Sequence, residues 1–220
     1  FIFYLFTERR TNKKKTKVLF FSKTVFNDDV KALIKFGKDF DYISFPRLYL
    51  THICKYFINN FEELNDANYH PQTHGKESII KLRDFLKKFI ITYKKLQPFD
   101  IVLSGNFVYT QLQELFYVLN QLNSPIVIIY KEGMFPQSRY KEMIDIFYTT
   151  KVFRANKILF YNKEIKNTLL KSKLPGLSKN DCSVVGVPRF DFYFLKNQTS
   201  ENLKKIVLFS FEPSVKAHYL

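Results

Sequence analysis

The strongest constraint on the fold is the alternation of short apolar runs with amphipathic segments. The runs are KVLFFS (17–22), DYISFP (41–46), DIVLSGN (100–106), PIVIIYKEG (125–133), KILFYN (157–162) and CSVVGVP (182–188). Runs of this length that end in Gly, Pro, Ser or Asn are typical of buried β-strands. Strands that alternate with helical segments are typical of βα units, whose strands form a parallel sheet.

The segments between the runs carry helical periodicity. The clearest lies at 76–97, where apolar residues recur every three or four positions until Pro98. Shorter helical patterns occupy 26–34, 48–64, 110–122 and 163–172, and 65–75 is a polar loop. About six strands with intervening helices over 17–190 predict an α/β fold, a doubly wound and mostly parallel Rossmann-like sheet.

The composition changes near the carboxyl end of the chain. FLKNQTSENLK (194–204) is polar and has no apolar period, and KKIVLFSFEP (204–213) has the pattern of a new strand. We expect an N-terminal domain over 1–193, a linker over 194–203, and at 204–220 the first strand of a truncated second α/β domain. The absence of an initiator Met also favours a fragment.

The formal net charge of +15 raises the question of a polyanionic partner. Lys and Arg are spread over three separate segments, so we expect a solvated basic surface and no nucleic-acid groove. The basic helix at 76–97 leaves a non-catalytic nucleic-acid-binding module open as an alternative. With 46% hydrophobic and 18% aromatic residues, the chain can bury a large core.

Cysteine and histidine usage gives no sign of a disulfide framework or a metal site. Cys54 and Cys182 lie far apart in the chain, which favours a reducing, cytoplasmic location. His70 and His74 have a spacing seen in metal-binding helices, but Pro71 and Gly75 break any helix there. FIFYLF (1–6) is too short to span a bilayer.

The candidate site residues follow the strands, because open parallel sheets bind ligands beyond their carboxyl ends. Ser104, Gly105 and Asn106 place a small side chain, a permissive glycine and an amide at one strand end. A ligand or another backbone segment can approach such a glycine closely, and an ordinary βα turn explains the same residues. No GxGxxG follows the first strand and no P-loop occurs, which argues against an NAD-dependent enzyme or an ATPase.

Lys131, Glu132 and Gly133 follow the next apolar run. A carboxyl group placed directly after a buried strand is partly desolvated, which raises its pKa. Glu132 therefore has the properties of a general base toward a hydroxyl group. A solvated Lys-Glu pair on a loop remains the alternative.

The stretch VVGVPRFD (184–191) joins a strand to two charged residues. Gly186 and Pro188 fix the backbone, and Arg189 offers a planar fork for a phosphate or carboxylate. Asp191 is an acceptor within reach of Arg189. Two interpretations stay open: an interdomain hinge of Gly186, Pro188 and Asp191 in which the two charges pair, or a contact between Arg189 and a ligand.

Three short motifs carry a family resemblance. GVPRFD (186–191) resembles the [TG]-G-x-P-R-x-D element of surface-carbohydrate biosynthesis proteins of the GT-B glycosyltransferase type. Related elements occur in glycerophosphotransferases and in proteins similar to UDP-N-acetylglucosamine 2-epimerase. RANKILFYNK (154–163) resembles the strand that precedes this element, and KKIVLFSFEP resembles the first strand of the nucleotide-binding second domain.

The resemblance implies a two-domain, metal-independent glycosyltransferase of surface polysaccharide or capsule assembly. A nucleotide sugar would be its substrate, with no further cofactor, and the acceptor would be a carbohydrate or a lipid-linked molecule at the inner membrane face. By the resemblance, Glu132 would activate the acceptor and Arg189 would lie near the cleft between the domains. Together with the residues at the strand ends, the predicted substrate-binding residues are Ser104, Gly105, Asn106, Lys131, Gly133 and Arg189. The chain alone is expected to be inactive, and a nucleotide-sugar 2-epimerase on the same scaffold is the alternative.

Overall fold

The computed structural model describes residues 15–22, 26–58, 76–131 and 151–192. By its internal contacts the chain divides into two compact units, Phe1–Arg189 and Phe190–Leu220. The fold below is that of the first unit. The linker predicted over 194–203 and the strand expected after it lie outside the described residues.

The described part of the first unit contains one parallel sheet. Its strands are β1 (Thr16–Ser22), β2 (Phe40–Pro46), β3 (Ile101–Ser104), β4 (Ile126–Tyr130), β5 (Lys157–Phe160) and β6 (Cys182–Val184). Their order in the sheet is β2-β1-β3-β4-β5-β6, and each neighbouring pair is parallel. Each strand coincides with an apolar run of the sequence, so the prediction of an α/β fold with a parallel sheet is confirmed.

The connecting helices also agree with the sequence periodicity. They are α1 (Asn27–Phe36), α2 (Arg47–Phe57), α3 (Lys76–Leu96), α4 (Thr110–Gln121) and α6 (Lys163–Lys171), with short 3-10 turns at Lys179–Asp181 and Pro188–Phe190. The helix predicted over 48–64 begins one residue earlier and ends at Phe57, and 59–64 lie outside the described residues. The long helix ends at Leu96, ahead of Pro98 as expected.

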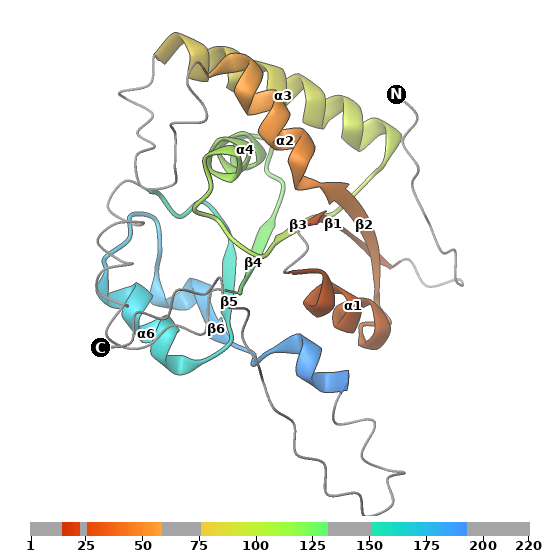
Figure 1. Ribbon diagram of the computed structural model, residues 1–220, viewed down its shortest axis with the longest axis vertical. Helices are drawn as coiled ribbons and strands as arrows, with labels where there is room; N and C mark the ends of the chain where they lie inside the picture. The colour runs from red at the N-terminus through yellow and green to blue at the C-terminus, as the bar shows by residue number, and fades with distance from the viewer. Residues whose placement is uncertain (1–14, 23–25, 59–75, 132–150, 193–220) are drawn as a thin grey trace, which may run out of the picture. The chain divides into compact units, whose positions relative to one another are not determined.

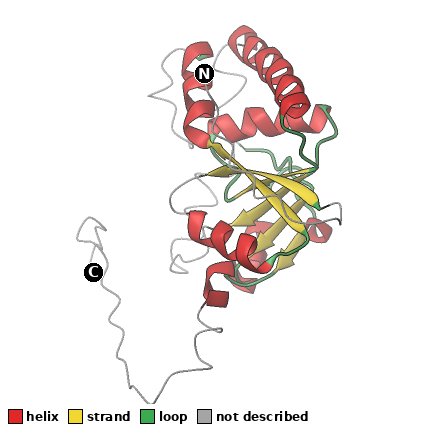
Figure 2. Ribbon diagram, turned by 90° about the vertical axis from the view of Figure 1, so that its right-hand side faces the viewer, coloured by secondary structure: helices red, strands yellow, loops and turns green. Residues whose placement is uncertain are grey.

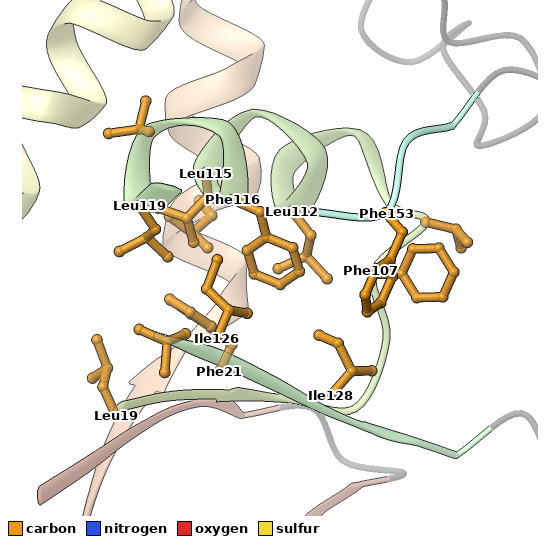
Figure 3. Packing of buried hydrophobic residues seen from close by; sticks show 14 of the residues in the cluster. Leu19, Phe21, Phe107, Leu112, Leu115, Phe116, Leu119, Ile126, Ile128 and Phe153 are labelled. Carbon is orange, nitrogen blue, oxygen red and sulfur yellow. The ribbon is translucent and has the colours of Figure 1, made fainter. Parts of the chain in front are cut away.

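Helices cover both faces of the sheet, as Figures 1 and 2 show for α1 on one side and α2, α3 and α4 on the other. Phe26 and Val30 of the α1 region pack against Phe20, Leu103 and Ile129 of the sheet. On the opposite face α4 packs its leucines on alternate strand residues, among them Leu19, Phe21, Ile126 and Ile128 (Figure 3). The sheet is therefore doubly wound.

Helix α4 lies at the centre of this second layer and is buried on almost every side. Its outer side meets α3, so the polar residues Gln111, Gln113 and Glu114 are buried, whereas Asn120 and Gln121 at its end are exposed. The side-chain amide of Gln113 donates hydrogen bonds to the carbonyl oxygens of Phe107 (2.7 Å) and Val152 (3.2 Å). Glu114 accepts a hydrogen bond of 2.5 Å from Nε of Arg83. These bonds satisfy the buried side chains of Gln113 and Glu114.

The strand order reverses at β1, which lies between β2 and β3. The chain leaves β1 through α1 on one face and reaches β3 through α2 and α3 on the other. The carboxyl ends of β1 and β3 therefore mark the place where open α/β sheets bind ligands. None of the helices in the described ranges is long and apolar enough to cross a membrane.

Candidate functional site

The turn after β3 is held by its own polar side chains. Ser104 donates a hydrogen bond of 2.7 Å from Oγ to the carbonyl oxygen of Asn106. Oδ1 of Asn106 accepts a hydrogen bond of 2.7 Å from the backbone N–H of Val108. Ser104 and Asn106 are both buried. These bonds favour the ordinary βα turn that the sequence left open, and a contact of these two side chains with substrate stays a prediction.

Gly105 lies directly beneath the ring of Phe26. A Cβ atom built on this glycine would be 2.8 Å from Cγ and 2.9 Å from Cδ2 of Phe26. The close approach that the sequence predicted at this glycine is therefore made by an aromatic side chain at the start of α1. Phe26 is fully buried, and its ring occupies the space beside Gly105 at the carboxyl end of β3.

Lys131 joins the same rim from the next strand. Its backbone N–H donates a hydrogen bond of 3.3 Å to the carbonyl oxygen of Gly105, so the ends of β3 and β4 are tied together. The side chain of Lys131 is half-buried. Glu132 and Gly133, the predicted general base and its neighbour, lie outside the described residues.

Two residues from separate strand ends, Tyr161 and Arg189, converge on one buried carboxylate, that of Asp29. The hydroxyl of Tyr161 donates a hydrogen bond of 2.5 Å to Oδ2 of Asp29. The backbone N–H of Arg189 donates to Oδ1 at 3.2 Å, and its Nη1 donates to Oδ2 at 3.4 Å. Asp29 is fully buried and the Arg189 side chain is 26% exposed. We call Asp29, Tyr161 and Arg189 the rim triad.

The course of the chain explains why these residues meet. Asp29 is in the first turn of α1, where the helix N-terminus favours a negative charge. Tyr161 follows β5 directly, and Arg189 follows the short β6. Gly186 has φ of +79°, a left-handed conformation that turns the chain back toward α1 after β6.

The rim triad bears on one of the two interpretations of Arg189, namely its pairing with Asp191. The carboxylate that holds its guanidinium is Asp29, which is 160 positions earlier in the chain. Pairing with Asp191 was the alternative in the sequence, and Asp191 is exposed. Among the described residues, Nη1 is the atom of the guanidinium group that makes a hydrogen bond. Nε and Nη2 make no hydrogen bond to any of the residues that the structure describes.

Asp29 was not among the predicted site residues. The sequence places it beside Asp28 at the start of an amphipathic helix, where two acidic residues are typical of a solvated first turn. Asp28 follows this pattern, since it is exposed and pairs with Lys31. No local signal separates the two, because the partners of Asp29 come from distant parts of the chain.

Neither cysteine is poised for chemistry. Cys54 and Cys182 are free and buried. Burial, together with the nearby charge of Glu114, raises the pKa of Cys54 to about 12. Burial also raises the pKa of Cys182. In the ranges that the structure covers, no group of three or more His, Cys, Asp or Glu residues could hold a metal ion.

Comparisons with known proteins return structural likeness alone. No family model matches the chain, and no curated protein does. A solved UDP-N-acetylglucosamine 2-epimerase from Rickettsia bellii is 14% identical with a TM-score of 0.43, and the match covers 83% of this chain and 48% of that one. A UDP-GlcNAc 2-epimerase from Neisseria meningitidis, bound to UDP-GlcNAc, is 12% identical with a TM-score of 0.45, covering 84% and 50%. The chain thus spans about half the length of these structures.

Proposed function

We propose that this unit is the substrate-facing part of an enzyme that acts on a nucleotide sugar, and that Arg189 binds an anionic group of the substrate. The observation that carries the proposal is the rim triad. It fixes an arginine at the carboxyl ends of a parallel sheet, the edge where such sheets bind ligands.

The arrangement suits an anion better than a neutral group. A guanidinium presents several donors in one plane, and this geometry matches the oxygens of phosphate and carboxylate groups. Asp29 occupies one donor and takes the backbone N–H as well, so the direction of the side chain is restrained before a ligand arrives. Such preorganisation lowers the entropy cost of binding.

The chemistry of the proposed reaction depends on Glu132, which stays a sequence-based prediction. In a transfer, Glu132 would take the proton of an acceptor hydroxyl, whose oxygen would attack the anomeric carbon as the nucleoside diphosphate leaves. In an epimerisation, the nucleotide sugar itself would change configuration at C2 without an acceptor. Both readings use the same rim.

One assay separates the two reactions. The protein encoded by the complete reading frame is incubated with UDP-N-acetylglucosamine, first alone and then with a carbohydrate acceptor, and the sugar is followed by proton NMR. A C2 epimer formed without acceptor identifies an epimerase. Release of UDP only with acceptor identifies a transferase. Absence of either reaction with a panel of nucleotide sugars would contradict the proposal, and full turnover in the Glu132→Gln variant would remove Glu132 from the mechanism.

A further inference from the structure

Two buried hydrogen-bond donors near the start of α4 have no acceptor among the described residues. Thr110 is the first residue of this helix and is 1% exposed, yet its Oγ1 has no hydrogen-bond partner there. Nη1 of Arg47, the first residue of α2, is likewise buried without a partner. A buried donor left unsatisfied costs about 1–3 kcal/mol, so two such donors near one helix end need an explanation.

The two groups belong to one place because the first turns of α2 and α4 lie against each other. The guanidinium carbon of Arg47 lies 4.2 Å from the ring centroid of Tyr109, the N-cap residue of α4. One turn further along α2, Thr51 accepts a hydrogen bond of 3.4 Å from the side chain of Gln111. Arg47 is therefore held over the N-terminus of α4 by stacking.

The backbone adds donors of the same kind. The N–H groups of Leu112 and Gln113 both donate to the carbonyl oxygen of Tyr109, at 2.9 Å each. The N–H groups of Thr110 and Gln111 precede this first bond and have no acceptor within the helix. The positive end of the helix dipole points in the same direction, which favours an anion.

The first turn of α4 contains no acidic residue that would oppose this preference. Tyr109, the N-cap residue, brings no carboxylate, and its side chain makes no capping bond. The carboxylate one turn further along α4 is Glu114, which forms an ion pair with Arg83. The cationic group at the helix start is therefore opposed by no acidic side chain of its own helix turn.

We infer that Arg47, Thr110 and the first amides of α4 form a binding site for a small oxyanion, a phosphate or a carboxylate group. The site lies at the ends of β2 and β3, on the sheet face that carries α4, whereas the rim triad belongs to α1 on the opposite face. It does not rest on the proposed function.

Thermal unfolding of the full 220-residue chain in inorganic phosphate tests the site, with sodium acetate and sodium chloride at equal ionic strength as the other arms. The wild-type midpoint should rise with phosphate or acetate beyond the rise in chloride, and the stronger of the two identifies the preferred group. Arg47→Met and Thr110→Val should each abolish this specific rise. Lys88→Met on the exposed face of α3 should retain it.

Thr110→Val carries a second readout. Because the Thr110 hydroxyl has no partner in the part of the chain that the structure describes, replacing it by a methyl group of similar size should leave the ligand-free protein as stable as the wild type or more stable, so a lost rise in phosphate would not reflect a damaged fold. An equal rise in all three salts would overturn the inference, as would a rise that survives both Arg47→Met and Thr110→Val. Direct confirmation comes from amide chemical shifts of Thr110 and Gln111, which should move on phosphate addition and saturate.

Discussion

Arg189 binds Asp29 through its backbone and its side chain at once, with N to Oδ1 at 3.2 Å and Nη1 to Oδ2 at 3.4 Å. The same carboxylate accepts a hydrogen bond from the hydroxyl of Tyr161. One buried side chain of α1 therefore fixes the segment that leaves the last strand of the sheet. This relationship makes Asp29 a positioning residue for Arg189 and gives the first prediction.

Asp29→Asn should destabilise the fold by about 1–3 kcal/mol, because an amide keeps the shape but loses the charge that Arg189 and Tyr161 share. The loss is smaller than for a fully buried pair, since Arg189 is partly exposed. Urea unfolding followed by circular dichroism measures it. Asp28→Asn is the matched control, as that exposed neighbour should show no measurable change. Equal effects of the two variants would refute the role of Asp29.

Gly105→Ala should cost about 1–3 kcal/mol, because the new methyl group would overlap the ring of the buried Phe26. The backbone at Gly105 is outside the left-handed region, so the cost comes from this contact alone. Phe26→Leu makes room, and Gly105→Ala should cost at least about 0.5 kcal/mol less in that background. A double-mutant cycle measures the difference, and strict additivity would show that Phe26 is not the obstacle.

Glu114→Gln should destabilise the fold by about 2–4 kcal/mol, because it removes the charge that Arg83 meets inside the helical layer. Glu77→Gln is the control, since that exposed carboxylate pairs with Lys81 on the surface of α3. Chemical unfolding of both variants tests the contrast. A Glu114→Gln variant as stable as the wild type would mean that the buried pair stabilises nothing.

The buried thiol of Cys54 predicts a loss of stability in alkaline solution. Its pKa rises from an ordinary value of 9.0 to about 12 in the folded protein, mainly through burial. The folded state therefore keeps the proton that the unfolded state releases. The contribution is constant below pH 9, and stability falls as the pH rises from 9 to 12. The slope should be smaller in Cys54→Ala, and an unchanged slope would assign it to other groups such as Tyr42 and Tyr93, whose pKa values burial also raises.

We expect the protein to bind nucleic acid weakly through helix α3, despite the many lysines of this helix. Lys81 pairs with Glu77, and Lys94 lies over the ring of Phe99 and reaches Ser124. The exposed face also carries Ile80 and Asp84, which interrupt any basic stripe. Filter binding of DNA and RNA at 50 and 200 mM salt should show weak affinity at both. Tight binding with a steep salt dependence would favour a nucleic-acid module.

The strands of the sheet could be predicted from the sequence, because each one is a short apolar run. Such a run is recognised locally, without knowledge of which strand it pairs with. The sequence also predicted the core of α4 from its leucines but not the burial of Gln113 and Glu114. Those two residues look like a solvated face until α3 and the segment at 152–154 cover them. Such coverage depends on contacts distant in the chain.

The candidate site shows the same division. The strand ends with Ser104, Lys131 and Arg189 could be placed at one rim from the strand pattern alone. Asp29 could not, since its bonds to Tyr161 and Arg189 span 132 and 160 positions. The packing of Phe26 on Gly105 is equally non-local, although the glycine itself signalled a close approach.

The central claim is that Arg189, held by Asp29, binds the anionic part of a nucleotide sugar. Isothermal titration calorimetry of the full-length protein with UDP-N-acetylglucosamine tests it most directly, with Lys87→Met as the control for net charge. The account predicts that Arg189→Gln weakens binding at least about tenfold, or about 1.4 kcal/mol, while the control binds like the wild type. Unchanged affinity in a correctly folded Arg189→Gln variant would contradict it.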